Sequence, residues 1–365
     1  MKLLYIAFID FDDLPSSGSS VRPIKMKQAF EQLNLEIITI SGSNNIIRDR
    51  RKSVKWILKK LKYWTPDICY IEPPSGPFFY HGDLTLIKKL HKMHIPIAIF
   101  YRDAYWKYPD FYMAEKTPFT EKVKLSIIRL MQRAQWRLFN NNTDIIYFPS
   151  KTMAEEFESD KKDCLPPGSF LPCFQDKTGI SEPIQFIFVG NATKNYGTFL
   201  TLDSFKKLNK ESVKAKLFYI CPKDNWDSLG IDKEEYSNWL NVIHLSGDDQ
   251  LKEYYEQSDV AILTAPKTLY RDFAIPIKIF EYISYLKPIL VTNCTETARV
   301  VAGNNVGWVC KDNVDSIVCA LEHVINNIDE IKEIKSHITE VRADNLWIEC
   351  AKKVISDLSN IKLRS

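Results

Sequence analysis

The chain has 365 residues, of which 45% are apolar and 26% are charged, and its formal net charge is +3. This length exceeds what one hydrophobic core usually serves, so we expect two domains. The small net charge gives no support for a nucleic-acid-binding protein, which usually carries a large local excess of Lys and Arg.

The cysteines and the N-terminus indicate a cytoplasmic protein. The eight cysteines show neither a Cys-x-x-Cys motif nor metal-ligand spacing, which predicts reduced thiols in the core. The apolar run in residues 1–10 is too short to span a membrane and leads into acidic residues, so it predicts a first strand and not a signal peptide. Any contact with the inner face of the cell membrane would be peripheral.

A loop of small residues follows the first strand and opens a helix that runs to about Asn34. The loop contains Gly18, Ser19 and Arg22, and small side chains let a ligand approach the backbone at the edge of a parallel sheet. A plain turn is an equally good reading. For the acidic residues of 10–13 we expect helix capping and turn chemistry, and no metal site.

Two segments of the first half are strongly basic. The first contains Arg48, Arg50, Arg51, Lys52, Lys55, Lys59, Lys60 and Lys62, with Trp56, Leu61 and Trp64 interleaved. The second runs from Lys122 to Phe139, with an apolar stripe of Val123, Ile127, Met131 and Leu138 beside Arg129, Arg133 and Arg137. Both are predicted helices. Either they contact an anionic membrane surface, or they pack Trp56 and Leu61 on the sheet beneath a solvated cationic face.

Polar residues follow two predicted strands between these segments. Residues 67–72 end in a proline-rich loop, and residues 95–101 lead into Arg102, Asp103, Tyr105 and Trp106. A carboxylate beside aromatic rings at the edge of a sheet could act as a general base, so Asp103 is the catalytic candidate. The alternative is an Arg102–Asp103 brace within the loop, with Tyr105 and Trp106 in the core.

The second half repeats the alternation of strands and helices. We expect strands at 184–190, 216–222, 241–247, 260–264 and 288–292, a helix at 251–258 and a last helix at 345–361. A loop with Gly190, Asn191, Thr193 and Lys194 follows the first of these strands.

The segment 270–307 organises the second half. Pro276 suits the first turn of a helix, whose free amides and positive dipole end favour phosphate. Lys278 can add positive charge, and the Glu281 carboxylate can accept hydrogen bonds from two hydroxyls of a ribose. The alternative is a solvated Lys278–Glu281 pair on an ordinary surface helix.

The string Pro276-x-Lys278-x-x-Glu281-Tyr282 is followed by Lys287-Pro288-Ile289-Leu290, Glu296 and Asn305-x-Gly307. It closely resembles the donor half of GT-B glycosyltransferases, of the group 1-like kind that builds bacterial polysaccharides and capsules. The resemblance is strongest over residues 184–310. It implies an α/β GT-B fold with two Rossmann-like parallel-sheet domains that face a cleft. It also implies an acceptor-binding domain at 1–170, a donor-binding domain at 171–344, and a helix at 345–365 that crosses back.

The resemblance also implies roles for individual residues. Donor binding falls to Gly18, Gly190, Asn191, Thr193, Lys194, His244, Leu245, Ala274, Ile275, Pro276, Ile277, Lys278 and Glu281. Acceptor binding falls to Ser19, Arg22, Arg102 and Tyr105. Two positions depart from the family pattern. Phe273 stands where many retaining relatives have a second glutamate, with Asp272 one residue away, and Asn191 stands where the family has a basic residue.

The expected activity is transfer of a hexosyl group from a nucleotide sugar, with a UDP-sugar preferred, to a hydroxyl of a polysaccharide or a lipid-linked oligosaccharide. The expected enzyme needs no metal and no cofactor. Two alternatives remain at this point: a non-catalytic partner subunit with a degenerate donor pocket, and a nucleotide-sugar epimerase of the same fold.

Overall fold

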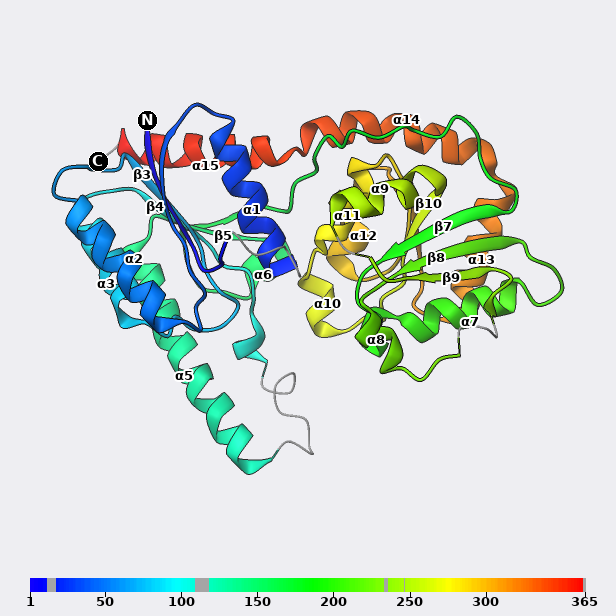
Figure 1. The fold of residues 1–365 in the computed structure, drawn as a ribbon, viewed down its shortest axis with the longest axis horizontal. Coiled ribbons are helices and arrows are strands. Elements are labelled where there is room, and N and C mark those ends of the chain that lie inside the picture. The colour runs from blue at the N-terminus through cyan, green and yellow to red at the C-terminus, as the bar shows by residue number, and fades with distance from the viewer. Residues whose placement is uncertain (12–17, 109–117, 233–235, 246, 364–365) are drawn as a thin grey trace. The chain divides into compact units, whose positions relative to one another are not determined.

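The computed structural model describes residues 1–11, 18–108, 118–232, 236–245 and 247–363. Internal contacts divide the chain into two units (Figure 1). Unit 1 comprises Met1–Pro166 and Trp347–Ser365, and unit 2 comprises Pro167–Leu346. The last helix of the chain therefore belongs to the same unit as the first strand.

Unit 1 is built on one six-stranded, all-parallel sheet with the order β2-β1-β3-β4-β5-β6. Its strands are β1 (Lys2–Ala7), β2 (Glu36–Ile40), β3 (Ile68–Glu72), β4 (Ile97–Phe100), β5 (Ile145–Phe148) and β6 (Lys162–Cys164). In β1, Leu3 pairs with Ile37 of β2 and with Ile68 of β3. The central strands are apolar along almost their whole length, which is typical of a parallel sheet covered by helices on both faces.

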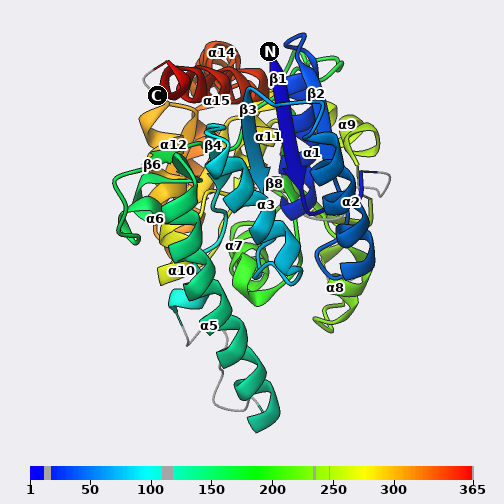
Figure 2. The same cartoon turned by 90° about the vertical axis from the view of Figure 1, so that its left-hand side faces the viewer.

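Helices lie on both faces of the unit 1 sheet (Figures 1 and 2). On one face, α1 (Gly18–Glu31) packs against α15 (Trp347–Lys362), which also contacts β3 and β4. On the other face, α2 (Ile47–Lys60) packs against α3 (His81–Lys92), and α3 packs against α5 (Phe119–Asn142). The short helices are η1 (Tyr105–Lys107) and α6 (Lys151–Glu155).

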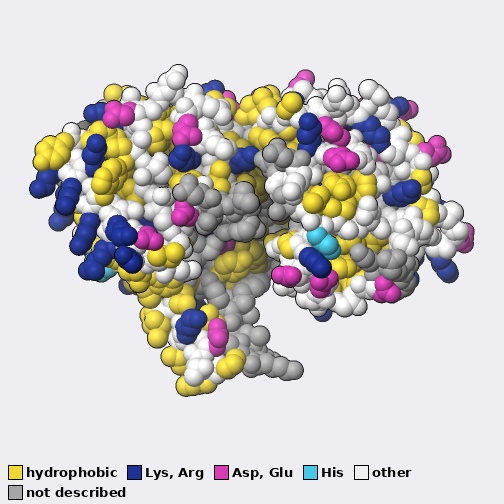
Figure 3. Space-filling view, viewed as in Figure 1, with side chains coloured by type: hydrophobic (Ala, Val, Ile, Leu, Met, Phe, Trp, Pro, Cys, Tyr) yellow, Lys and Arg dark blue, Asp and Glu magenta, His cyan; other side chains and the backbone are white. Residues whose placement is uncertain are grey.

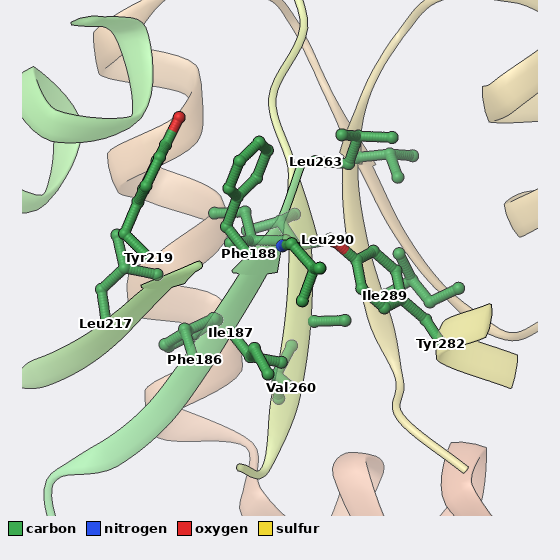
Figure 4. Packing of buried hydrophobic residues seen from close by; sticks show 14 of the residues in the cluster. Phe186, Ile187, Phe188, Leu217, Tyr219, Val260, Leu263, Tyr282, Ile289 and Leu290 are labelled. Carbon is green, nitrogen blue, oxygen red and sulfur yellow. Dashed lines mark hydrogen bonds between the residues drawn. The ribbon is translucent and has the colours of Figure 1, made fainter. Parts of the chain in front are cut away.

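Unit 2 has a second six-stranded, all-parallel sheet with the order β12-β11-β10-β7-β8-β9. Its strands are β7 (Ile184–Val189), β8 (Ala215–Ile220), β9 (Leu240–Ile243), β10 (Val260–Leu263), β11 (Ile289–Thr292) and β12 (Gly307–Cys310). Figure 4 shows how side chains from β7, β8, β10 and β11 fill the core. The hydroxyl of Tyr282 accepts a hydrogen bond from the Val189 amide at 3.1 Å, which ties a helix to the end of β7.

Several helices of unit 2 pack against one another in pairs. The described helices of this unit are η2 (Lys194–Tyr196), α7 (Thr198–Leu208), α8 (Lys223–Asp227), α9 (Asp248–Gln257), α10 (Leu269–Phe273), α11 (Ile277–Ser284), α12 (Thr295–Gly303), α13 (Val314–Asn326) and α14 (Ile328–Asp344). Helix α7 packs against α13, α10 against α12, and α11 against α14. The predicted α/β class with two parallel sheets is confirmed.

The cysteines match the sequence prediction in part. All eight are free thiols. Four of them, Cys69, Cys221, Cys294 and Cys310, are buried, and burial raises the pKa of the Cys221 and Cys310 thiols to about 12. Cys173 and Cys319 are exposed, so the prediction that all the cysteines lie in the core is wrong for these two.

Across the described ranges, every helix is too short or too polar to cross a membrane.

Candidate functional site

The order of the strands in unit 2 marks where a ligand is expected to bind. The chain leaves β7 toward β8 on one side of the sheet, whereas β10 lies on the other side of β7 and leads to β11. Parallel α/β sheets bind ligands beyond the carboxyl ends of the strands, where the direction of winding reverses. In unit 2 this switch point lies between β7 and β10, so the loops that follow these two strands form the candidate site.

The loop after β7 is held by a side-chain cap at Thr193 and by a close backbone contact at Gly197. Thr193 caps η2 by accepting a hydrogen bond from the Tyr196 amide at 3.3 Å, and the neighbouring Asn191 and Lys194 are exposed. Gly197 has φ of +78°, and a Cβ atom at this position would lie 1.9 Å from the carbonyl oxygen of Thr264. Glycine is therefore required here, because the loop after β7 touches the backbone at the end of β10.

A ring contact joins the same two loops. The guanidinium carbon of Arg271, in α10, lies 4.1 Å from the centre of the Tyr196 ring, in η2. Such a stacked cation typically contributes about 0.5–1 kcal/mol at an exposed site. The two loops at the switch point are thus connected by both backbone and side-chain contacts.

The loop after β10 ends at the N-terminus of α11. Ala274 and Pro276 have extended backbone conformations, and Pro276 is the N-cap residue. The sequence places Pro276 in the first turn, so the observed start is one residue later. Ile275 is buried, and Ile277 begins the helix. The first amides of α11 have no partner within the helix, and they carry its positive dipole end.

The Lys278–Glu281 pair is part of a larger group. Glu281 is 9% exposed, and one of its carboxylate oxygens accepts a hydrogen bond from the hydroxyl of buried Tyr255 at 2.7 Å. The other oxygen lies 2.7 Å from Lys278 Nζ. Burial, and then the Glu281 charge, raise the pKa of Tyr255 well above its usual value, so this phenol stays protonated and donates. The alternative of a solvated surface pair does not fit Glu281.

The position of the missing second glutamate has a different use. Phe273 is buried at 3% exposure, and its ring packs on Tyr270 with centres 5.0 Å apart. Asp272 Oδ1 accepts hydrogen bonds from the amide and the hydroxyl of Thr295, at 3.0 and 2.9 Å. Asp272 therefore stabilises the N-terminus of α12, and its carboxylate is occupied within unit 2.

His244 and Leu245 follow β9, on the far side of the same sheet edge. His244 is exposed and Leu245 is partly buried. His244 Nδ1 lies 3.0 Å from the carbonyl oxygen of Cys221, at the end of β8. A carbonyl can only accept, so Nδ1 carries the proton in this contact, and Nε2 is left as the acceptor of a neutral ring.

In unit 1, two of the predicted acceptor residues, Arg22 and Arg102, contact a buried carboxylate that sequence reasoning missed. Glu72, at the end of β3, is fully buried. Its Oε1 accepts hydrogen bonds from Arg22 Nε at 3.0 Å and from the Tyr70 hydroxyl at 2.7 Å, and its Oε2 accepts one from Arg102 at 3.1 Å. The Arg22 guanidinium is 3% exposed and stacks on Phe100 at 3.4 Å from the ring centre. Arg22 thus neutralises Glu72 inside unit 1.

Arg102 and Asp103 line a small polar cavity at the same edge of the unit 1 sheet. The proline-rich loop of residues 73–76 forms one wall, and Gln132 and Gln135 of α5 form another. Gln135 both donates to and accepts from the backbone of Phe78, at 3.0 and 2.8 Å, and Gln132 donates to the Ser75 carbonyl at 3.1 Å. Within the described part of the chain, the buried Gln132 Oε1 has no hydrogen-bond partner. This cavity therefore offers an acceptor atom to a ligand or to a water molecule.

The remaining predicted residues of unit 1 are placed less centrally. Gly18 and Ser19 begin α1, and Asp12 and Asp13 lie outside the described residues. Tyr105 is partly buried in η1. Trp106 is 8% exposed and donates to the Tyr101 hydroxyl at 2.7 Å, so it belongs to the core as the alternative reading expects.

The two basic segments form α2 and α5, with two corrections. Arg50 is fully buried and bonded to Asp83, to the Ala7 carbonyl at 2.9 Å and to the Ser41 carbonyl at 3.2 Å. It therefore cannot reach an external surface. Trp56 is 50% exposed, so the alternative that packs it on the sheet is wrong, whereas Leu61 is buried as that alternative expects.

Comparisons with known proteins agree with this geometry. Residues 174–340 match the family model described as glycosyl transferases group 1. No curated protein matches the chain in sequence.

Solved structures resemble the chain over nearly its whole length. Sucrose-phosphate synthase from Thermosynechococcus elongatus has a TM-score of 0.70 at 10% identity, over 100% of both chains. WaaG, a glycosyltransferase involved in lipopolysaccharide biosynthesis, has a TM-score of 0.66 at 13% identity, over 97% of this chain and 99% of WaaG. Anabaena Alr3699/HepE, in complex with UDP-glucose, has a TM-score of 0.62 at 12% identity, over 99% of this chain and 100% of HepE. At these identities the likeness establishes the fold.

The fold and the family match together support glycosyl transfer as the chemistry of this chain. The chain therefore has the GT-B fold of two parallel-sheet units, and its residues 174–340 match the family model of the glycosyl transferases group 1.

Proposed function

We propose that the chain transfers a hexosyl group from a nucleoside diphosphate sugar to a hydroxyl of a polysaccharide or a lipid-linked oligosaccharide, without a metal ion or a cofactor. One observation carries the proposal. At the unit 2 switch point, the N-terminus of α11 stands beside Lys278 and the nearly buried carboxylate of Glu281, whose oxygens accept hydrogen bonds from Tyr255 and Lys278.

The diphosphate of the donor would lie at the N-terminus of α11. The amides of Ile275 and Ile277, together with Lys278 and Lys194, would supply positive charge to it, since helix N-termini and lysines both stabilise phosphate groups. When the ribose binds, Glu281 accepts hydrogen bonds from its two hydroxyls, and the Lys278 ammonium group moves from Glu281 to the phosphate. Tyr255 keeps the carboxylate in place during this exchange.

The reaction needs one bond to break and one to form. The bond from the anomeric carbon to the diphosphate oxygen breaks, and both electrons leave with the diphosphate. The acceptor oxygen bonds to the anomeric carbon, and its proton passes to Asp103 as general base. Lys194, Lys278 and the α11 amides stabilise the charge that develops on the departing diphosphate, which is the task a metal ion performs in other transferases.

The nucleobase of the donor would contact the backbone after β9, near His244 and Leu245. We favour a uridine nucleotide because HepE, which shares the fold, is described in complex with UDP-glucose. The acceptor hydroxyl would enter the polar cavity of unit 1 that Arg102, Asp103 and Gln132 line.

Donor binding can be tested by thermal shift with UDP-, GDP- and dTDP-glucose. A ligand that binds only the folded state adds about 2.7 kcal/mol at a concentration one hundred times its Kd, so one of these nucleotides should raise Tm by several degrees. Glu281→Ala and Lys194→Ala should each reduce that shift. Glu253→Ala is the matched control, because Glu253 is exposed on α9 and should leave the shift unchanged. A chain that responds to none of the three sugars would not be this enzyme.

The role of Asp103 has its own test. Asp103→Asn should bind the donor as the wild type does and should not transfer sugar to an acceptor, because the amide cannot take the proton. Normal turnover would remove Asp103 as the base. Donor binding without transfer by the wild type, on any acceptor tried, would favour the non-catalytic partner subunit instead, for which the buried Phe273 and the exposed Asn191 are the supporting departures.

A further inference from the structure

The helix layer of α2, α3 and α5 presents an unusual outer surface on unit 1. Helix α2 buries Arg50, Val54 and Ile57 toward the sheet. At about 100° per residue, Lys52, Lys55 and Lys59 point in the opposite direction, and all three are exposed. Trp56 at 50% exposure stands beside them, and Tyr63 follows the helix at 89%.

Helix α3 continues the cationic surface. It buries Leu86, Ile87 and Leu90, so Lys88, Lys89 and Lys92 are directed outward and are exposed. We call the outward lysines of these two helices the basic face: Lys52, Lys55, Lys59, Lys88, Lys89 and Lys92. Figure 3 shows Lys and Arg side chains gathered over this side of unit 1.

The basic face is not neutralised from within the protein. The acidic side chains on α2, α3 and α5 are Asp49, Asp83 and Glu121, and Asp83 is buried against Arg50. Among the described residues, Lys52 alone of the basic face forms an ion pair, with Asp49 at 3.5 Å. Because the whole chain carries a net charge of only +3, the positive charge is concentrated here.

Helix α5 adds a row of exposed apolar side chains to the same layer. We call this row the apolar stripe; it shares Val123 and Ile127 with the stripe expected from the sequence. The N-terminal half of α5 exposes Phe119 at 80%, Val123 at 43%, Ile127 at 55% and Leu130 at 68%. Spacing of three to four residues puts these side chains on one line of the helix. The line is opposite the buried residues Gln132, Gln135 and Phe139, so it faces away from the sheet. In Figure 2, α2, α3 and α5 lie side by side with their outer surfaces toward the viewer.

We propose that the basic face and the apolar stripe bind a bilayer that contains anionic lipids. The lysines would contact headgroup phosphates, Trp56 and Tyr63 would lie at the headgroup level, and the apolar stripe would enter the boundary of the acyl chains. Amphipathic helices with this division of residues lie in the plane of a membrane surface. A polyanion such as RNA would use the lysines but would leave the four apolar side chains in water, so a lipid surface accounts for more of the observations.

The test is co-sedimentation of the full chain with vesicles. Phosphatidylcholine vesicles should bind it weakly, and vesicles that also contain phosphatidylglycerol should bind it strongly, with affinity falling as salt rises. Lys52→Gln/Lys55→Gln/Lys59→Gln should weaken binding by about a hundredfold, since each cation near an anionic surface is worth about fivefold. Ile127→Ser/Leu130→Ser should weaken it by about tenfold or more, because these side chains no longer leave water.

A matched control uses three exposed lysines of unit 2. Lys210→Gln/Lys216→Gln/Lys223→Gln removes the same charge from the chain and should leave vesicle binding unchanged. All of the altered side chains are exposed, so each variant should keep the Tm of the wild type. Absent binding to the anionic vesicles would overturn the proposal, as would equal losses in the control. Binding that the Ile127→Ser/Leu130→Ser variant leaves intact, together with tight binding of RNA, would identify a polyanion site and overturn it too.

Discussion

The two units share one sheet plan but treat a carboxylate at the sheet edge in opposite ways. Glu72 of unit 1 is fully buried, and two arginines and a tyrosine occupy its oxygens. Glu281 of unit 2 remains 9% exposed and shares its charge with a lysine that is 32% exposed. The position in the fold therefore does not decide whether a charged residue serves a ligand. What matters is whether its partners can be exchanged.

The largest expected effect comes from removing the fully enclosed carboxylate. Glu72→Ala leaves the buried Arg22 without the carboxylate that neutralises it, and breaking a buried pair in this way costs about 3–5 kcal/mol. Hydrogen-exchange mass spectrometry should show lost protection in peptides of unit 1, while peptides of unit 2 keep theirs. Glu31→Ala, which breaks an exposed pair with Lys27, is the control and should change stability by less than about 0.5 kcal/mol. Similar losses of stability for both variants would mean that the enclosed carboxylate of Glu72 contributes no more than an exposed ion pair.

The second prediction concerns Lys287, a buried charged residue of unit 2. It lies at the amino ends of the strands, opposite to the candidate site. Lys287 precedes β11 and is fully buried, with its Nζ 2.9 Å from the Ser258 carbonyl and 3.9 Å from Asp176. Burial, and then the neighbouring charge of Lys335, lower its pKa from 10.5 to about 8 in spite of Asp176 and Asp259, while Lys177 adds to the lowering.

The sign of the resulting pH dependence follows from proton binding. Between pH 8 and 10.5 the unfolded chain holds a proton on Lys287 that the folded chain has lost, so stability rises with pH in this window. Compared with Lys287→Met, the wild type should gain roughly 3 kcal/mol in its free energy of unfolding across it. Urea unfolding at a series of pH values measures this difference. A difference that does not change with pH would mean that the charge of Lys287 is well compensated, as that of Glu72 is.

The smallest expected effect belongs to the exchangeable carboxylate. Glu281→Ala removes the acceptor of the Tyr255 hydroxyl, which costs about 1–2 kcal/mol for a buried group left without a partner. Lys278 loses nothing, because its ammonium group is free to contact water. Urea unfolding should therefore show a clearly smaller loss for Glu281→Ala than for Glu72→Ala. Equal losses would mean that the two carboxylates do the same structural work.

Much of the fold could be predicted from local pattern. The strands expected at 184–190 and 260–264 match β7 and β10 to within one residue. Continuous apolar runs reveal buried parallel strands directly. The short strand β6, Lys162–Cys164, carries no such run, because its three residues are only partly buried and two of them are charged, so it could not be read from the sequence.

The Lys278–Glu281 contact at the candidate site could be predicted because the two residues lie close together in the sequence. Lys278 and Glu281 are one helical turn apart, so their contact follows from spacing. The link from Glu281 to Tyr255 and the link from Glu72 to Arg22 join separate elements, so only the tertiary structure reveals them. Arg50 is an instructive miss. Its spacing of four and seven residues from Val54 and Ile57 places it on the buried side of α2, a signal that the surrounding basic residues hide.

The contact at Gly197 sets the distance between the two loops of the unit 2 switch point. A Cβ at position 197 would lie 1.9 Å from the carbonyl oxygen of Thr264, so the backbones of the two loops are in direct contact there. Exchanges of neighbouring side chains cannot narrow the distance between them, and any residue other than glycine must widen it. The separation of these loops is therefore fixed by Gly197, and a library of variants that seeks altered ligand binding at this site should vary the residues around it and leave this glycine in place.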